Sequence, residues 1–294
     1  MLALPYDEPL YRPPSEAHSL ILQVSLGCSW NSCGFCEMYT SKQFRVRPER
    51  DVLEEIRAVG ETGLPVRKVF LADGDAMVLS TRRLMTVLDA LREHIDGKPR
   101  VSCYAMPRQL SKKSSQELQE LRDAGLRLVY VGVESGDDEV LKRIDKGETE
   151  ASTVDGLLRA GEAGIKRSVM ILNGLGGRQF TKQHAVGSAR VLNATHPEFA
   201  SVLVMMLPAG DDRFQHIFGD GFIPQSQREL LEEMACFIEH TELENTIFRS
   251  DHASNYLVLR GILNRDKEAL LGRVRQAIDN PGGSGLRSDG YRGF

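Results

Sequence analysis

Three cysteines lie within nine residues, at Cys28, Cys33 and Cys36, with four residues between the first two and two between the last two. Thiolates this close in sequence can bind one metal centre. A structural zinc site closes with four ligands, and a [4Fe–4S] cluster ordinarily takes four thiolates, but the nearest other cysteine is Cys103. Three ligands leave one coordination position open to another molecule, and this open position predicts an enzyme.

The length and composition of the chain allow a large globular fold. Its 294 residues suffice for one large α/β barrel or two modest domains. The net charge of −4 argues against a broad nucleic-acid-binding surface. No apolar run approaches the roughly 20 residues that span a bilayer, and residues 1–14 contain no apolar signal core. Five cysteines, an odd number with three clustered, fit a reducing compartment, so we expect a cytoplasmic protein.

Short apolar runs alternate with amphipathic stretches from Leu20 onward, which is the pattern of a parallel α/β sheet. The predicted strands, rich in Val, Ile and Leu, are residues 20–25, 68–72, 100–104, 126–133, 166–172 and 201–207. The predicted helices between them are residues 51–62, 81–94, 114–124 and 152–163. We therefore expect the functional side of the protein at the carboxyl ends of these strands.

Glycines and polar side chains follow several of these strands. Asp73–Asp75 comes after the second strand, Glu134–Gly136 after the fourth and Asn173–Gly177 after the fifth. The cysteine run follows the first strand directly. Because the carboxyl ends of parallel strands meet at one edge of a sheet, these segments are expected on the same rim.

The character of the chain changes after Pro224. Helices are predicted at residues 225–240 and 264–278. The expected organisation is therefore an N-terminal extension, a central α/β domain and a C-terminal helical extension, at residues 1–19, 20–223 and 224–294.

A dense polar block, Arg249–Tyr256, separates the two predicted C-terminal helices. One interpretation is a polar cap over the mouth of the α/β domain. The other is that Arg249, His252 and Asn255 line the side on which a substrate binds.

Taken in order, these motifs resemble the radical S-adenosylmethionine (radical SAM) superfamily over Leu20 to Leu207. The resemblance implies a partial (β/α)6 barrel and a [4Fe–4S] cluster on three cysteines, with SAM chelating the fourth iron. The reduced cluster would cleave SAM to a 5′-deoxyadenosyl radical that abstracts hydrogen from a substrate. It further implies an electron donor such as flavodoxin or ferredoxin, and a small-molecule or carrier-bound substrate.

The resemblance assigns SAM contacts near the first two strands. Phe35 matches the aromatic residue before the last cysteine, which suits packing beside the adenine. Asp73-Gly74-Asp75 resembles the Gly-Gly-Glu type motif that holds the SAM amino group, with Asp73 in place of its first glycine. The resemblance therefore implies SAM contacts at this motif only for Gly74 and Asp75.

Further SAM contacts are implied after the fourth and fifth strands. Glu134 lies in a segment that resembles Gly-x-(Glu/Gln)-Ser-Gly, and it would contact polar groups of SAM. Lys146 occupies the trailing basic position and would pair with the SAM carboxylate. Gly174 belongs to a glycine-bearing segment that would lie along the adenine. The motifs identify no catalytic residue and no substrate.

The cysteine spacing departs from the common superfamily pattern, which has three residues between the first two cysteines instead of four. The closest resemblance is to a branch often labelled coproporphyrinogen III oxidase-like. True members of that oxidase family carry the three-residue gap. The label is therefore an analogy of fold and does not identify the substrate.

Two alternatives stay open on the residues alone. A zinc-stabilised binding protein without redox chemistry would need a fourth ligand from elsewhere, such as Cys103, His252 or Glu37. A radical SAM enzyme of sulfur insertion or methyl transfer would keep the fold with a different outcome.

Overall fold

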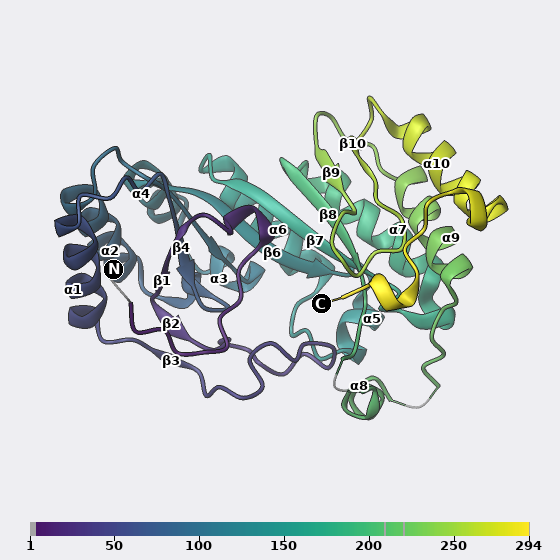
Figure 1. Cartoon of the computed structure of the whole chain (residues 1–294), viewed down its shortest axis with the longest axis horizontal. Coiled ribbons are helices and arrows are strands. Elements are labelled where there is room, and N and C mark those ends of the chain that lie inside the picture. The colour runs from purple at the N-terminus through teal and green to yellow at the C-terminus, as the bar shows by residue number, and fades with distance from the viewer. Residues whose placement is uncertain (1–3, 209, 220, 294) are drawn as a thin grey trace. The chain divides into compact units, whose positions relative to one another are not determined.

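The computed structural model describes residues 4–208, 210–219 and 221–293. The chain forms two compact units, which we describe separately (Figure 1). The units are residues 1–31, 36–131 and 156–167 for the first, and residues 32–35, 132–155 and 168–294 for the second. Residues 1–3 of the expected N-terminal extension, residues 209 and 220 of the central domain, and residue 294 of the C-terminal extension lie outside the described residues. The three-part division expected from the sequence stays a prediction.

The first unit is built on parallel strands that pair in the order β1, β4, β5 and β6. Their bounds are β1 (Leu20–Gln23), β4 (Lys68–Ala72), β5 (Arg100–Tyr104) and β6 (Leu126–Glu134). Val69, Phe70 and Leu71 of β4 are at most 1% exposed, as expected for a strand covered on both faces. The predicted parallel pairing is confirmed in this unit, and β4 and β5 have the bounds expected from the sequence.

Helices connect these strands, and their local sequences explain where they begin and end. They are α1 (Glu49–Glu61), α2 (Thr81–His94), α3 (Pro107–Ser111), α4 (Ser115–Ala124) and α6 (Glu150–Glu162), with short 3₁₀ turns η1 (Pro14–Glu16) and η2 (Ala76–Val78). Ser114 and Glu117 form a capping box at the start of α4. Gly125 ends that helix with a φ of 126°, a conformation that favours glycine.

The cysteines lie between the two strands of a small antiparallel sheet. Strand β2 (Ser25–Leu26) pairs with β3 (Arg45–Val46). The cysteines lie in the connection between these two strands, which we call the cysteine loop (residues 27–44). The loop therefore begins and ends at adjacent positions. The sequence predicted residues 20–25 as one strand, whereas the structure divides this segment after Gln23.

The second unit contains strands β7 (Lys166–Asn173), β8 (Phe199–Val204), β9 (Ile247–Arg249) and β10 (Arg260–Ile262). Strands β7, β8 and β9 are parallel neighbours, and β10 pairs with β9 in antiparallel fashion. Strand β8 begins two residues before the predicted strand 201–207 and ends three residues before it does. The sequence did not predict β9 or β10, since three residues are too few to show a periodicity.

The helices of the second unit are α5 (Asp138–Arg143), α7 (Gly177–Thr195), α8 (Asp212–Phe218), α9 (Gln227–Glu239) and α10 (Lys267–Asp279), with turns η3 (Pro281–Gly283) and η4 (Asp289–Tyr291). Helix α9 packs against both α7 and α10 (Figure 1, green and yellow). The two predicted C-terminal helices are confirmed as α9 and α10. Helix α7 was not predicted, because its buried positions include His184, Gly187 and Ser188 instead of large apolar residues.

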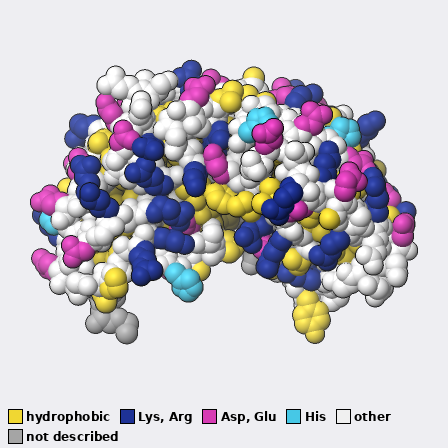
Figure 2. Space-filling model, turned by 90° about the horizontal axis from the view of Figure 1, so that it is seen from above, with side chains coloured by type: hydrophobic (Ala, Val, Ile, Leu, Met, Phe, Trp, Pro, Cys, Tyr) yellow, Lys and Arg dark blue, Asp and Glu magenta, His cyan; other side chains and the backbone are white. Residues whose placement is uncertain are grey.

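The surface carries both signs of charge. Figure 2 shows Lys and Arg side chains spread among Asp and Glu side chains over one face of the molecule. Within the described residues, no helix combines the length and the apolar character needed to cross a membrane.

Candidate active site

The cysteine loop holds three cysteines, none of which is joined in a disulfide. Cys28 and Cys36 are half-buried in the first unit, and Cys33 is buried and belongs to the 32–35 segment of the second unit. Because three residues span at most about 11 Å, the covalent chain keeps the Cα atom of Cys33 within that distance of Cys36. The two-residue spacing therefore keeps Cys33 and Cys36 near each other along the chain.

A single metal ion and a [4Fe–4S] cluster require different arrangements of ligands. In the part of the chain that the structure describes, no three His, Cys, Asp or Glu side chains converge as ligands of one metal ion. A [4Fe–4S] cluster offers a separate iron to each thiolate, so it takes thiols that surround it. Cys103, a fourth ligand considered for zinc, is fully buried, and burial raises the pKa of its thiol. A raised pKa opposes the thiolate form that zinc requires.

Gly74 lies directly against the cysteine loop. Its N–H donates to the carbonyl oxygen of Gly27 at 3.1 Å. A Cβ atom at position 74 would lie 3.0 Å from Cys28 Cβ and 2.9 Å from the ring of Tyr39. Only glycine therefore lets the turn after β4 approach Cys28 this closely. The structure places predicted Gly74 beside a predicted cluster ligand, and its contact with SAM stays a prediction.

Asp75 is fully buried on the same turn. One carboxylate oxygen accepts a hydrogen bond from Ser29 Oγ at 2.6 Å, and the other accepts from the N–H of Met106 at 3.3 Å. Ser29 follows Cys28 in the chain, so Asp75 also holds the start of the cysteine loop. The acidic side chain predicted from the motif therefore lies next to the loop within the first unit.

Phe35, Glu134 and Lys146 lie together in the second unit. Lys146 Nζ is 3.1 Å from Glu134 Oε1 and 5.8 Å from the centroid of the Phe35 ring. A Cβ atom at Gly132 would lie 2.0 Å from Glu134 Oε1, so the carboxylate folds back over Gly132 and would have to move if a larger residue stood there. Glu134 itself has a φ of 63°, in the left-handed region. Non-glycine residues with this backbone conformation are found preferentially at functional sites. Three predicted SAM contacts are thus brought together.

The segment after Cys33 is also fixed within the second unit. The N–H of Gly34 donates to the carbonyl oxygen of Ile144 at 2.8 Å, and Arg213 Nη1 donates to the carbonyl oxygen of Gly34 at 3.0 Å. These main-chain contacts orient the peptide between Cys33 and Phe35. Arg213 was not predicted to have this role, because its partner is far away in the sequence.

The N–H of Gly174 belongs to a buried polar network around Glu233, which was not predicted from the sequence. This N–H donates to Glu233 Oε1 at 2.7 Å, and Gln225 Nε2 donates to Oε2 at 3.0 Å. His184 Nε2 lies 3.6 Å from Glu233 Oε1, and its Nδ1 shares a hydrogen bond with Ser135 Oγ at 2.8 Å. A glutamate on the buried face of α9 was the available signal, since such positions are usually apolar.

Burial governs the protonation of this network. Burial raises the pKa of Glu233 to about 7, against the hydrogen bonds from Gly174 and Gln225 that lower it. Burial also lowers the pKa of His184 to about 4. The 3.6 Å contact between the two groups favours their charged forms, but both are only 1% exposed, so desolvation prevails. Between these two pKa values, both side chains are neutral.

The pH dependence of stability is expected to change in the Glu233→Gln variant. Since the folded pKa is raised, the stabilisation from protonated Glu233 is complete below the ordinary value of 4.5 and is lost as pH rises through about 7. Relative to the variant, the wild-type free energy of unfolding is expected to fall by up to about 3 kcal/mol over this window. Urea unfolding at a series of pH values measures this difference, in which the contribution of His184 cancels.

A matched control is the Glu232→Gln variant. Glu232 is the exposed neighbour of Glu233 and pairs with Arg228 at the surface. Its pH profile is expected to parallel that of the wild type. Parallel profiles for wild type and the Glu233→Gln variant would contradict the raised pKa.

The polar block 249–256 bonds largely within the second unit. Ser250 Oγ donates to the carbonyl oxygen of Leu257 at 2.8 Å, and Asn255 Nδ2 donates to that of Val202 at 2.9 Å. Both side chains are 1% exposed. These contacts give the buried members of the block a structural role, and both interpretations of the block stay predictions.

Comparisons with known proteins show the family to which the chain belongs. A family model described as the Radical SAM superfamily matches residues 22–191, which is more than half of the chain. The chain is 24% identical over 179 residues to the heme chaperone HemW of Bacillus subtilis, covering 58% of this chain and 47% of that protein. It is 27% identical over 152 residues to GTP 3′,8-cyclase of Erythrobacter litoralis, covering 50% and 44%. The chain thus spans about half the length of the curated relatives it matches.

Solved structures show the same fold. The coproporphyrinogen III oxidase of Escherichia coli, a radical SAM enzyme, has a TM-score of 0.58 at 18% identity, covering 75% of this chain and 52% of that chain. Methylornithine synthase has a TM-score of 0.52 at 15% identity, covering 87% and 80%. The expected α/β radical SAM fold is confirmed. The protein belongs to the radical SAM superfamily, a family of enzymes that use a [4Fe–4S] cluster and S-adenosylmethionine.

Proposed function

We propose that this enzyme binds a [4Fe–4S] cluster through Cys28, Cys33 and Cys36 and cleaves SAM reductively. When bound, the cluster supplies the electron that splits SAM into methionine and a 5′-deoxyadenosyl radical, which abstracts hydrogen from the substrate. The cysteine loop carries this proposal, because none of its three cysteines is joined in a disulfide and Gly74 fits against Cys28 as only glycine can. The match of residues 22–191 to the superfamily model supports it.

The neighbouring side chains would bind the amino-acid part of SAM. Glu134 and Lys146 carry opposite charges, which complement an ammonium and a carboxylate. Both are mostly buried, and charges interact more strongly away from water. Asp75 and the backbone at Gly74 would face the SAM amino group.

The remaining predicted contacts would hold the adenosine part. Phe35 offers an aromatic ring for adenine to pack against. The Gly174 turn would lie along the adenine, with Glu233 keeping its N–H in place. These residues bind and orient SAM, and they leave hydrogen abstraction to the radical.

The proposal requires partners. A one-electron donor such as flavodoxin or ferredoxin would reduce the cluster, and the substrate would be a small molecule or a carrier-bound group. Cysteines that form no disulfide fit a reducing environment, and we therefore propose that the enzyme acts in the cytoplasm.

Anaerobic reconstitution tests the function. The wild-type protein is expected to bind about four irons and about four sulfides per chain. With dithionite and SAM it is expected to form 5′-deoxyadenosine. One zinc with neither iron nor sulfide would instead favour the zinc-stabilised binding protein. Transfer of sulfur or a methyl group to the substrate would identify the other alternative, a radical SAM enzyme of sulfur insertion or methyl transfer.

A further inference from the structure

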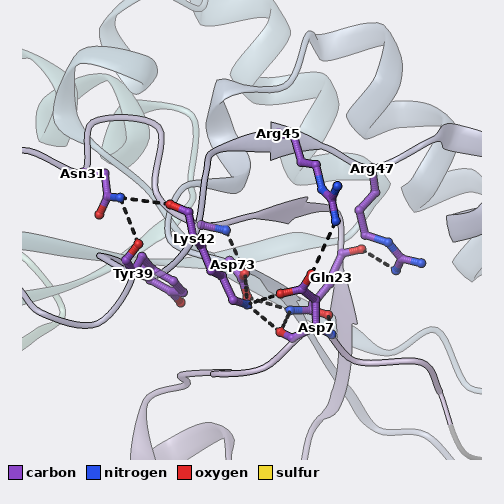
Figure 3. Close-up of polar contacts among 9 residues, drawn as sticks. Asp7, Gln23, Asn31, Tyr39, Lys42, Arg45, Arg47 and Asp73 are labelled. Atoms are coloured by element: carbon purple, nitrogen blue, oxygen red, sulfur yellow. Dashed lines mark hydrogen bonds and ion pairs between the residues drawn. The ribbon is translucent and has the colours of Figure 1, made fainter.

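A buried ion pair lies at the base of the cysteine loop (Figure 3). Lys42 Nζ is 3.1 Å from Asp73 Oδ2, and the two side chains are 6% and 0% exposed. Asp73 stands where the Gly-Gly-Glu type motif has its first glycine. The motif has no carboxylate at this position, so the role of Asp73 follows from its contacts.

The carboxylate of Asp73 joins the two ends of the loop. Its Oδ2 accepts from the N–H of Gly27 at 2.9 Å and from Lys42 Nζ, while Oδ1 accepts from Gln23 Nε2 at 3.0 Å. Gly27 directly precedes Cys28, and Lys42 follows Cys36 by six residues. One carboxylate thus fastens the segment that contains all three cysteines.

The N-terminal segment completes the coordination of the Lys42 ammonium group. Besides Asp73, Lys42 Nζ contacts Asp7 Oδ1 at 3.2 Å and donates to the carbonyl oxygen of Asp7. Asp7 is in turn tied to Gln23, whose Oε1 accepts from the Asp7 N–H at 2.9 Å. An ammonium group has three donors, and here three protein oxygens lie around it. A buried pair satisfied in this way holds its geometry, whereas loss of one partner leaves an unpaired buried charge.

Asn31 makes a second connection across the loop. It lies in the four-residue gap between Cys28 and Cys33, and its Nδ2 donates to the carbonyl oxygens of Tyr39 at 2.9 Å and Lys42 at 3.3 Å. Its φ of 48° is in the left-handed region, which asparagine tolerates better than most residues. The enlarged gap is thereby tied back to the segment that follows Cys36 (Figure 3).

We propose that Asp73 and Lys42, together with Asn31, are positioning residues that hold the cysteine loop in the conformation that receives the cluster. The inference rests on the proposed function and deepens it. Loop closure before cluster binding lowers the ordering cost of binding, because the thiols need little rearrangement. Retention of the cluster then depends on this ion pair more than on the general stability of the unit.

The test compares two neutralised buried carboxylates of the first unit, Asp73→Asn and Glu16→Gln. Glu16 is also fully buried, but it bonds to Arg100 and to Tyr130 Oη. Since breaking a buried pair is costly, Asp73→Asn is expected to speed chelator-driven loss of the cluster at least about tenfold, and Glu16→Gln less than about twofold. Both rates are read from visible absorbance, and urea unfolding reports the stability of each variant.

A second readout uses the protein without its cluster. Alkylation of Cys28 and Cys36, followed by peptide mapping, is expected to be faster in Asp73→Asn than in the wild type and unchanged in Glu16→Gln. Asn31→Ala, which removes no charge, is expected to shift both readouts in the same direction. Lys42→Met is expected to behave like Asp73→Asn, and Lys42→Arg to fall between Lys42→Met and the wild type, because it keeps the charge but replaces the compact ammonium group with a larger planar guanidinium.

Two results would overturn the inference. The first is that Asp73→Asn and Asn31→Ala lose the cluster and are alkylated at wild-type rates. The second is that Glu16→Gln accelerates both processes as much as Asp73→Asn does, which would indicate that any loss of a buried carboxylate loosens the first unit. If Asp73→Asn does not fold, Asn31→Ala and the Lys42 pair of variants decide. If the wild type takes up no cluster, the proposed function fails, and the alkylation rates alone decide the role of these residues.

Discussion

Replacing Cys36 with alanine is expected to abolish cluster binding. Reconstituted protein would contain iron and sulfide only at the background of an untreated sample, and 5′-deoxyadenosine would not form. The reason is that three thiolates already leave one iron open, so the loss of another leaves only two of the four thiolates that a cluster ordinarily takes. The two cysteines outside the loop do not substitute, because burial raises the pKa of both Cys103 and Cys236 and disfavours their thiolates.

The matched control is Cys236→Ala. Cys236 is half-buried in helix α9, with its sulfur 3.8 Å from His240 Nδ1. We expect normal iron content, visible absorbance and EPR signal of the reduced cluster. A Cys36→Ala protein that retained a full cluster would show that Cys36 is not a ligand, whereas loss of the cluster in Cys236→Ala would point to a different ligand set.

The second large effect is expected from Gly136→Ala. A Cβ atom at this position would lie 2.1 Å from the carbonyl oxygen of Gly187 and 2.6 Å from the nitrogen of Ser188, both in the backbone of α7. Backbone on both sides leaves no flexible side chain to move away, so the free energy of unfolding is expected to fall by about 3 kcal/mol or more. Urea unfolding of the purified variant measures this loss, and failure to recover folded protein would be its extreme form.

Gly272→Ala is the control for that variant and is expected to have the opposite sign. Gly272 is exposed in the interior of α10, and a Cβ atom there would meet nothing within 4 Å. Alanine in a helix interior is favoured over glycine by about 1 kcal/mol, so this variant is expected to be slightly more stable than the wild type. Wild-type stability of Gly136→Ala would contradict the close contact between this turn and α7.

The fold was predictable where local patterns are strong. The buried run at β4 and the helical spacing of Val52, Ile56 and Val59 in α1 both indicate their structures within a few residues. Helix α7 was missed because polar and glycine residues at its buried positions pack against particular neighbours, and no periodicity reports such contacts. Strands β9 and β10 were missed because they are short and depend on pairing with distant segments.

The sequence by itself determined the elements of chemistry: the spacing of Cys28, Cys33 and Cys36, their place after the first strand, and the order of the glycine and acidic motifs along the chain. These features are visible because they lie close together in the sequence or repeat with the period of strands and helices.

Only the tertiary structure decided which distant groups support them. Asp73 reaches Gly27 across 46 residues, and Glu233 reaches Gly174 across 59. Gly136 lies so close to the backbone of α7 that a Cβ atom there would be 2.1 Å from the carbonyl oxygen of Gly187. Such contacts join segments that are distant in the sequence. No local sequence pattern indicates which side chains will be buried there or which partners they will have.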